Sequence, residues 1–477
     1  MIGRKEERQI LEDLYQRNTP NLIAVYGRRR IGKTYLINTV FHDRISFRHT
    51  GMQPGEDVSY KEEEKRQLRA FLASLQEYGY TKTEAPDTWL SAFSALERLL
   101  EKKESKEKSV LFFDEIQWMD SKRSDFISAF GYFYNQWASC HNVMVIVCGS
   151  STSWILNKLI NAHGGLYDRV TREIPLKPFT LKECEEYALS LGLEMSHYAL
   201  CCCYMALGGV PFYWNYLSKN KSLAQNIDAL FYSTNGPLRN EFHRMFASLF
   251  ANAESVENII RALYSKSRGL TRDEIAKATG QNKNGDLSER LNSLIAGNFI
   301  IKYVSFKENR REPLFKLVDP FSLFYLHFVD KNATIGEGTW MKLSESPKVL
   351  SWQGLAFENL CFNHIQEIKS ALGIANVETS ASLWSKKGDD EEAGTQIDMV
   401  LYRKDMVCDL CEIKFLEDEF ILDKEYHLLL TRRKNMLKEL LPKRFSVQNV
   451  LISTYGLKKN PYADDFSYVL TLDDLFK

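Results

Sequence analysis

The chain lacks an excess of either charge. Its 62 lysine and arginine residues are matched by 62 aspartate and glutamate residues, so the formal net charge is zero. This balance excludes a global electrostatic attraction to nucleic acid or to a membrane, and any such binding must come from a local patch.

Long apolar runs are also missing. No stretch of the sequence approaches the ~20 residues that a membrane-spanning helix needs. The charged start, residues 1–8, has no apolar core of a signal peptide. We therefore expect a cytoplasmic protein with no membrane partner.

Cysteine is scarce, with nine among 477 residues. The number is odd, and a chain of this length needs no disulfides, which favours a reducing compartment. Cys408 and Cys411 have the C-x-x-C spacing of metal and redox sites. No second cysteine pair and no suitable histidine pair lies nearby in the sequence, so we expect neither zinc nor redox chemistry there.

The chain does have enough residues for three or four domains of ordinary size. Its clearest motif has the pattern G-x-x-x-x-G-K-T and consists of Gly27, Arg28, Arg29, Arg30, Ile31, Gly32, Lys33 and Thr34. An apolar run, 22–26, directly precedes it, so strand, glycine loop and helix follow in the order that a phosphate-binding loop requires.

The backbone N–H groups of such a loop and the start of the next helix both favour an anion. We expect Lys33 to reach the terminal phosphates, Thr34 to hold Mg²⁺, and Tyr35 to close the nucleotide-binding segment. ATP is favoured over GTP because no N-K-x-D motif follows the next acidic strand.

That acidic strand is the apolar run 110–113, which ends in Asp114 and Glu115. Asp114 is expected to hold Mg²⁺ at the sheet edge, and Glu115 to act as the general base that polarises water. A third run, 143–148, ends in a glycine and two serines, 149–151. These serines are expected either to sense the γ-phosphate or to cap the next helix, and the sequence leaves both open.

The pattern from residue 22 to about 175 alternates short apolar runs with amphipathic segments, which indicates an α/β fold with a parallel sheet. A further strand near 45–50 falls between the two motifs along the chain. An inserted strand is typical of additional-strand P-loop NTPases. We expect residues 1–178 to form this ATPase core.

Residues 179–248 are predicted to be helical. Thr180 and Glu183 have the spacing of a capping box, and a Gly-Gly-Val-Pro sequence at 208–211 breaks the region. We expect a helical lid over the nucleotide.

Residues 249–335 are predicted to form a winged helix. The expected elements are helices at 256–265, 272–279 and 286–296 and strands at 299–306 and 313–318. Such modules often bind DNA through the third helix, but this one carries one arginine and two acids, whereas the turn 307–311 is more basic. DNA binding and a structural or partner-binding role both stay open.

After a predicted linker, 331–347, residues 345–477 are expected to form another α/β unit. A helix at 354–366 carries Glu358, a strand carries Asp398, and the next strand ends in Glu412 and Lys414. Alternate residues of a strand share one face, so Glu412 and Lys414 point into one site, which Asp398 can join.

Two carboxylates such as Asp398 and Glu412 can hold Mg²⁺. A neighbouring lysine, here Lys414, can then orient or deprotonate water for attack on a phosphodiester. The alternative is that these alternating charges only form a solvated strand face.

Taken together, these segments resemble a family of prokaryotic, archaeal-type AAA-like ATPases. Its members carry a C-terminal domain of uncharacterised function that is similar to restriction-endonuclease-like, PD-(D/E)xK folds. The matching segments are Ile2-Gly3-Arg4-x-x-Glu7, Tyr26 to Thr34, Phe113 to Gln117, Arg169 with Leu176-x-Pro178-Phe179, Gly208 to Pro211, Asp319 to Phe321, Phe357-Glu358, Gln396 to Asp398 and Cys411 to Phe415.

The resemblance implies that Ile2, Gly3 and Arg4 lie near the nucleotide base. It makes Arg169 a candidate arginine finger on the γ-phosphate, within its own chain or in a neighbour. A salt bridge from Arg169 to a nearby acid is equally open. Oligomerisation also stays open, because AAA-type proteins are often rings.

Two hypotheses follow for the function. In the first, an ATPase couples its nucleotide state to a nuclease-like domain in which Asp398, Glu412 and Lys414 cleave DNA. In the second, the protein is an ATP-dependent regulatory switch whose winged helix and C-terminal domain only bind a partner or DNA.

Overall fold

The computed structural model describes residues 1–55, 58–102, 107–121, 123–161, 164–250, 252–306, 312–330, 336–386 and 394–477. The chain forms two compact units, Met1–Lys177 and Pro178–Lys477. Of the helices that the structure describes, none is long and apolar enough to cross a membrane. All nine cysteines are free thiols.

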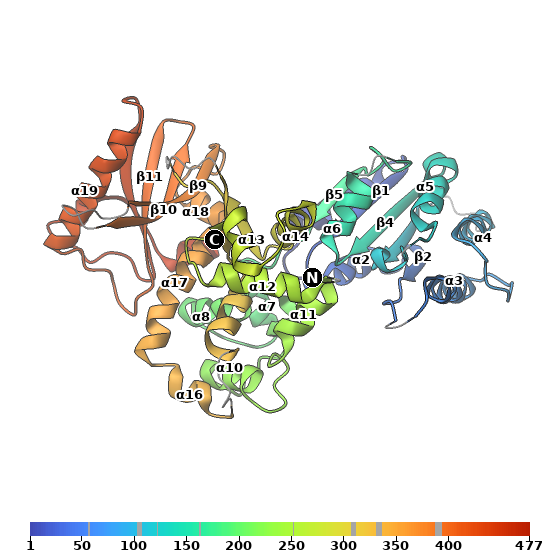
Figure 1. Cartoon of the computed structure of the whole chain (residues 1–477), viewed down its shortest axis with the longest axis horizontal. Coiled ribbons are helices and arrows are strands. Elements are labelled where there is room, and N and C mark those ends of the chain that lie inside the picture. The colour runs from blue at the N-terminus through green and yellow to red at the C-terminus, as the bar shows by residue number, and fades with distance from the viewer. Residues whose placement is uncertain are drawn as a thin grey trace. The chain divides into compact units, whose positions relative to one another are not determined.

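The first unit is built on a five-stranded parallel sheet in the order β2–β3–β4–β1–β5 (Figure 1). Its strands are β1 (Asn21–Tyr26), β2 (Ile45–Thr50), β3 (Ser109–Asp114), β4 (Val143–Gly149) and β5 (Arg172–Pro175). The predicted α/β core is confirmed. The strand expected near 45–50 exists as β2 but lies at the outer edge, and β4 is the strand that separates β1 from β3.

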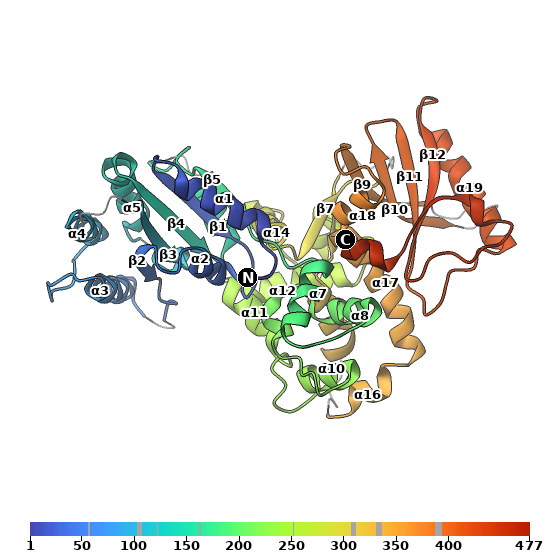
Figure 2. The ribbon, with the colours of Figure 1, turned by 180° about the vertical axis from the view of Figure 1, so that it is seen from behind.

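Helices cover both faces of this sheet, and β1 is therefore buried on both sides. Leu22 and Ala24 face one apolar cluster, while Ile23 and Val25 face the other. The first cluster packs against α3 (Tyr60–Glu77), α4 (Trp89–Glu101), α5 (Phe126–Gln136) and α6 (Thr152–Ile155). The second packs against α1 (Lys5–Gln16) and α2 (Lys33–Val40), which Figure 2 shows from behind.

The second unit begins with a helical region. Its helices are α7 (Leu181–Ser190), α8 (His197–Leu207), α9 (Pro211–Trp214), α10 (Leu223–Phe231) and α11 (Glu241–Leu249). The predicted capping box is present, since Thr180 Oγ1 accepts from the Glu183 N–H and the Glu183 side chain accepts from the Thr180 N–H. Gly208 ends α8 at a positive φ of 64°, and α9 starts at Pro211, so the predicted break is also present.

Three helices and a small antiparallel sheet follow, which we call the three-helix module. Its elements are α12 (Ala253–Tyr264), β6 (Leu270–Thr271), α13 (Arg272–Thr279), α14 (Gly285–Ala296), β7 (Ile300–Tyr303) and β8 (Leu314–Leu317). The strands are ordered β6–β8–β7. The basic turn expected at 307–311 lies outside the described residues.

The C-terminal part is a mixed sheet in the order β13–β12–β11–β10–β9. The elements are α17 (Pro347–Asn363), α18 (Ile365–Ala371), β9 (Thr379–Lys386), β10 (Thr395–Arg403), β11 (Val407–Lys414), α19 (Lys424–Leu440), β12 (Ser446–Ser453) and β13 (Phe466–Leu470). Cys411 packs towards α17 and Cys408 towards α19. The two thiols therefore lie on opposite faces of the sheet and do not form a metal or redox pair.

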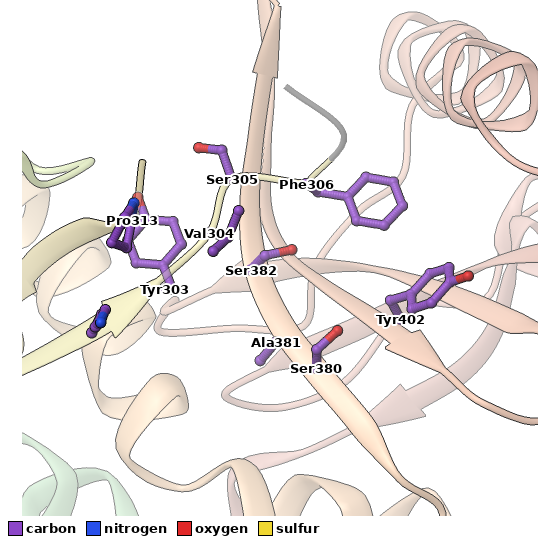
Figure 3. Close-up of a pocket in the computed structure, with 10 residues that line it drawn as sticks. Tyr303, Val304, Ser305, Phe306, Pro313, Ser380, Ala381, Ser382 and Tyr402 are labelled. Atoms are coloured by element: carbon purple, nitrogen blue, oxygen red, sulfur yellow. The ribbon is translucent and has the colours of Figure 1, made fainter. Parts of the chain in front are cut away.

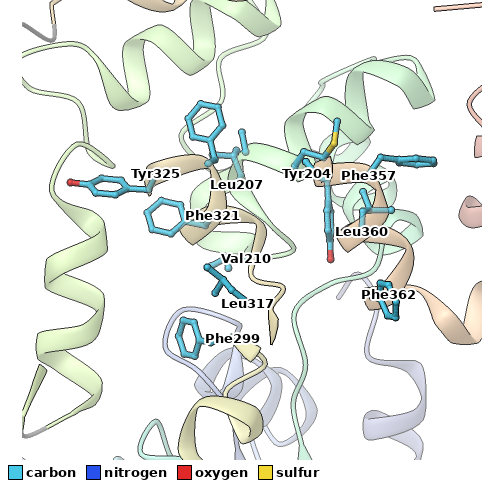
Figure 4. Packing of buried hydrophobic residues seen from close by; sticks show 14 of the residues in the cluster. Tyr204, Leu207, Val210, Phe299, Leu317, Phe321, Tyr325, Phe357, Leu360 and Phe362 are labelled. Atoms are coloured by element: carbon cyan, nitrogen blue, oxygen red, sulfur yellow. The ribbon is translucent and has the colours of Figure 1, made fainter. Parts of the chain in front are cut away.

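One apolar cluster runs through all parts of the second unit. Figure 4 shows Leu207, Phe299, Phe321 and Phe357 from four different segments within it. The segment predicted as a linker also belongs to this core, because α15 (Pro320–Phe324) precedes it and α16 (Thr339–Leu343) lies within it. Trp340 of α16 is 7% exposed, so the described part of 331–347 is not a free linker.

Candidate functional site

The glycine loop after β1 has the backbone that a phosphate-binding loop needs. Gly27 has a φ of 147°, and a Cβ there would lie 2.3 Å from the carbonyl oxygen of Leu176. Gly32, at a φ of 92°, forms the N-cap of α2. Arg30 also has a positive φ of 69°. Only glycine fits at position 27, and these left-handed conformations turn the loop back onto the start of the helix.

Lys33 lies across this loop. Its Nζ donates hydrogen bonds to the carbonyl oxygens of Gly27 and Arg28, both at 2.9 Å. Burial lowers the pKa of Lys33, and the carboxylates of Glu115 and Asp114 act in the opposite direction. The ammonium group is thus held over the loop, where a bound phosphate would meet it.

Thr34 and Asp114 meet as the two motifs predicted. Thr34 Oγ1 donates to Asp114 Oδ2 at 2.8 Å, and burial is the main cause that raises the pKa of Asp114. Two oxygen ligands this close suit Mg²⁺, so this pair fits the metal. Arg48 of β2 also approaches Asp114 Oδ2, at 3.7 Å. The sequence analysis missed Arg48, whose only signal is a basic residue inside the strand at 45–50.

Glu115 is held by the end of β4. Its Oε2 accepts from the Ser150 N–H at 3.2 Å and from Ser150 Oγ at 2.7 Å. Gln117 Nε2 donates to the same oxygen. Glu115 also has the left-handed backbone angles φ 46° and ψ 46°, a strained state for this residue type that often marks functional sites.

The serines after β4 were expected to sense phosphate or to cap a helix. Ser151 is the N-cap of α6 but makes no side-chain capping hydrogen bond. The hydroxyl of Ser150 is committed to Glu115. The capping alternative is therefore confirmed for the position of Ser151 but not for a capping hydrogen bond.

The start of the chain packs behind the loop. Arg4 Nη2 donates to the carbonyl oxygens of Ile31, at 3.2 Å, and of Lys177, at 2.7 Å. Ile2 is partly exposed and Gly3 is buried. Tyr35, on α2, is 62% exposed. The structure thus brings Arg4 to the loop segment, whereas the contact of Ile2 and Gly3 with a base stays a prediction.

Arg169 lies at the opposite edge of the sheet. It comes just before Thr171, whose backbone pairs with Leu22 at the start of β1, while the glycine loop follows the end of β1. The length of β1 separates the two, about 16 Å at roughly 3.3 Å per residue. The backbone of Arg169 thus lies at the end of β1 remote from the glycine loop, and its role as an arginine finger stays a prediction. Its side chain makes no ion pair with an acid of the described ranges, so the salt bridge is not observed either.

In the C-terminal part, Asp398, Glu412 and Lys414 come together as predicted. Lys414 Nζ lies 3.5 Å from Asp398 Oδ2 and 3.5 Å from Glu412 Oε2. Burial acts to lower the pKa of Lys414, but the carboxylates of Asp398 and Glu412 together raise it above the usual value. Lys414 therefore stays protonated and is suited to orient groups rather than to remove a proton.

Glu412 has further partners on α19 that the sequence did not reveal. Its Oε1 pairs with the guanidinium of Arg433, and its Oε2 accepts from the Tyr426 hydroxyl. Asp398 Oδ2 accepts from the Ile413 N–H at 2.9 Å. Within the described ranges, no group of three or more His, Cys, Asp or Glu side chains is arranged to hold a metal. The acidic cluster is thus compensated by protein cations, and its fit to Mg²⁺ is partial.

Glu358 and Lys316 extend this cluster. Burial, followed by the carboxylate of Asp398, raises the pKa of Glu358 to about 7. Burial lowers the pKa of Lys316 to about 8, opposed by Glu358. Lys316 belongs to β8 of the three-helix module, and its Nζ donates to the Ser267 carbonyl at 2.6 Å. No local pattern in the sequence connects Lys316 with a cluster so far along the chain.

The second unit also contains a cavity that is less suitable as a catalytic site than the acidic cluster. This cavity of about 540 Å³ lies between residues 302–306 and β9. Figure 3 shows Ser380 and Ser382 on β9 and Tyr402 beside it. Its lining contains hydroxyls and apolar groups, with Lys302 as its charged residue, and so lacks the acid and base that chemistry requires.

Comparisons with known proteins agree with the first of these sites. Residues 1–217 match the family described as an ATPase domain predominantly from Archaea. The uncharacterized protein MJECL04 of Methanocaldococcus jannaschii is 24% identical over 378 residues, 77% of each chain. The uncharacterized ATP-binding protein MJ0423 of the same organism is 46% identical over 43 residues, 9% of this chain and 73% of that protein.

Among solved structures, the Walker-type ATPase PABY2304 of Pyrococcus abyssi is 19% identical, covers 68% of this chain and 96% of its own, and has a TM-score of 0.48. The Orc1 protein of Aeropyrum pernix, solved in complex with DNA, is 11% identical, covers 68% and 93%, and has a TM-score of 0.33.

Proposed function

We propose, from the match of residues 1–217 to the archaeal-type P-loop ATPase family, that the chain binds ATP in this domain and that the domain controls a nuclease-like C-terminal site that acts on DNA. The ATPase assignment agrees with the loop geometry. The coupling to DNA chemistry is the new element.

In the proposed ATPase cycle, the loop N–H groups and Lys33 bind the phosphates, and Thr34 and Asp114 hold Mg²⁺. A Mg²⁺ ion held by this pair would neutralise charge on the terminal phosphates. Glu115 accepts a proton from the attacking water, and Oε1 suits this step because the hydrogen bonds from Ser150 and Gln117 go to Oε2. We also propose that Ile2, Gly3 and Arg4 border the base and that Arg169 acts on the nucleotide of a neighbouring copy.

The nuclease-like assignment rests on one observation, the ammonium of Lys414 bridging Asp398 and Glu412. The element order α17–α18–β9–β10–β11–α19–β12 supports it, because β10 and β11, which carry the predicted residues, are neighbours in one sheet and α17 packs against it. Asp398 and Glu412 would hold Mg²⁺, which stabilises charge on a phosphodiester. Lys414 would orient the attacked phosphate.

We further propose the division of the chain into an ATPase core (1–178), a helical lid (179–248), a winged helix (249–335) and a nuclease-like domain (345–477). The helices and strands of the second unit follow this order along the chain. The proposed lid, winged helix and nuclease-like domain share the apolar cluster of the second unit, so they pack against one another.

A cleavage assay tests the proposal. Supercoiled DNA is incubated with Mg²⁺, with and without ATP, and with wild-type protein or Lys414→Ala. We expect nicking by the wild type and none by Lys414→Ala. Lys404→Ala, which removes an exposed lysine paired with Glu378, should nick like the wild type. If the wild type cuts neither DNA nor RNA under any metal and nucleotide condition, the nuclease proposal is wrong.

A second candidate function is an ATP-dependent switch that binds DNA or a partner without cleavage. It is favoured by Glu412, both of whose oxygens are already bonded by Arg433 and Tyr426. In this case Asp398→Ala and Lys414→Ala leave the cellular activity intact, whereas Lys33→Ala abolishes it.

A further inference from the structure

The acidic cluster of the C-terminal part has a wall made by another part of the chain. A cavity of about 300 Å³ is bordered on one side by Glu358, Gln396 and Asp398. The other side is formed by the three-helix module, through the turn 265–268 and Lys316. Both sides belong to the same compact unit.

The module that carries the wall makes direct contacts with the C-terminal part. The Phe306 N–H donates to the Leu383 carbonyl of β9 at 3.2 Å, and Figure 3 shows Val304 to Phe306 running beside this strand. Asn363 Nδ2 donates to the Val318 carbonyl at 3.0 Å. These hydrogen bonds fix the position of the module relative to β9 and α17 beside the cavity.

The wall is basic where it meets the cavity. Lys266 and Arg268 are exposed, and the buried ammonium of Lys316 holds the turn between them through the Ser267 carbonyl. No ion pair of Lys266 or Arg268 is found in the described part of the chain. These two cations are available to an anionic ligand.

The third helix, α14, is a weaker candidate for DNA contact. Its arginine, Arg290, donates to Gln281 Oε1 at 2.7 Å, and Asp286 and Glu289 lie on the same helix. Phosphate contacts require uncommitted lysine and arginine side chains. The basic side of the module is thus the turn and not the helix that docks in many winged-helix proteins.

We infer that the turn 265–268 is the phosphate-binding wall of the C-terminal site, so that a DNA strand lies against Lys266 and Arg268 with its backbone directed towards Asp398. This inference rests on the proposed action on DNA and names the surface that holds the substrate. Arg268 can bind a phosphate through two N–H groups, and Lys266 acts as a point charge.

DNA binding tests the inference separately from cleavage. Fluorescence anisotropy with labelled duplex DNA, in EDTA so that nothing is cut, compares the wild type with Lys266→Ala/Arg268→Ala. The matched control is Lys277→Ala/Lys302→Ala, which removes two exposed charges of the same module that do not line this cavity. Thermal unfolding and ATP hydrolysis confirm that each variant is folded.

We expect the wall variant to bind about tenfold more weakly or worse. The slope of log K against log salt should shrink by about two, since each lost phosphate contact changes it by roughly 0.9. The control should bind like the wild type. The inference would be overturned, with the proposed function left standing, if the wall variant had the affinity and salt slope of the wild type. It would also be overturned if the control lost as much affinity as the wall variant. A wild type that binds no DNA would overturn it together with the proposed function.

Discussion

The backbone N–H of Leu181 donates a hydrogen bond to Nε2 of His364 at 3.0 Å. Nδ1 of the same ring lies 2.9 Å from the Leu360 carbonyl. The ring must therefore accept at Nε2 and donate at Nδ1, which only the neutral imidazole can do. This contact joins the first turn of α7 to the end of α17.

His364 makes the stability of the second unit depend on pH. The side chain is 1% exposed, and burial lowers its pKa below 6.5, although Glu367 and Glu183 act in the opposite direction. The unfolded chain gains a proton below about pH 6.5 and the folded chain does not. The stabilisation is thus complete above about pH 6.5 and is lost as the pH falls through the lower folded pKa.

We expect His364→Gln, which can still accept and donate but does not titrate, to flatten this loss. Thermal unfolding at pH 7.5 and 5.5 should show a smaller drop in Tm for His364→Gln than for the wild type. His42→Gln, at an exposed histidine paired with Asp43, should behave like the wild type. Parallel pH profiles for wild type and His364→Gln would contradict the assignment.

The ATP site predicts a separation of binding from hydrolysis. Glu115→Gln removes the proposed base but leaves the loop and Lys33 intact, so ATP should bind with nearly unchanged affinity. Hydrolysis should fall by about 10²–10⁴-fold. Calorimetry and phosphate release measure the two quantities, and Lys33→Ala serves as the variant that loses binding. Wild-type hydrolysis by Glu115→Gln would exclude its role as the base.

The sequence was informative where a function depends on neighbours along the chain. The pattern of 27–34 sets the loop backbone, and the strand alternation around Glu412 and Lys414 places both on one face. The residues of the first site meet because β1 and β3 end at the same edge of one parallel sheet, and those of the second because β10 and β11 are neighbours.

The sequence was uninformative where partners are chosen by packing. Arg48, Arg433 and Lys316 reach their carboxylates from separate elements, and nothing local marks them. Arg169 shows the converse, because its motif is visible in the sequence but the register of β5 on β1 places it at the far edge. Register is fixed by tertiary contacts and cannot be read from one strand.

The pair Glu412–Arg433 predicts a large effect on stability. Both side chains are buried, so Arg433→Met leaves a buried carboxylate with less compensation and should destabilise the protein by about 3–5 kcal/mol. Adding Glu412→Gln to Arg433→Met should recover part of this loss. Urea unfolding measures both, with Lys438→Met on the exposed side of α19 as control. If Arg433→Met left the free energy of unfolding nearly unchanged, Lys414 and Tyr426 would compensate the Glu412 carboxylate without Arg433.

Gly209 contacts the first residues of the second unit and gives a prediction about how they are anchored. A Cβ at this position would lie 2.0 Å from the Phe179 carbonyl oxygen, and the Phe179 N–H donates to the Gly209 carbonyl at 2.7 Å. Because the clash is with backbone, no side chain can move to relieve it. Gly209→Ala should therefore cost at least the upper end of the about 1–3 kcal/mol that overpacking usually costs.

The matched control is Gly354→Ala in α17, where a Cβ meets nothing within 4 Å. Removing a helical glycine should there stabilise the protein by about 0.5–1 kcal/mol. The two substitutions add the same methyl group and should shift the urea midpoint in opposite directions. Equal shifts would mean that the segment at Phe179 can separate from Gly209 without loss, and that the start of α7 is not anchored there.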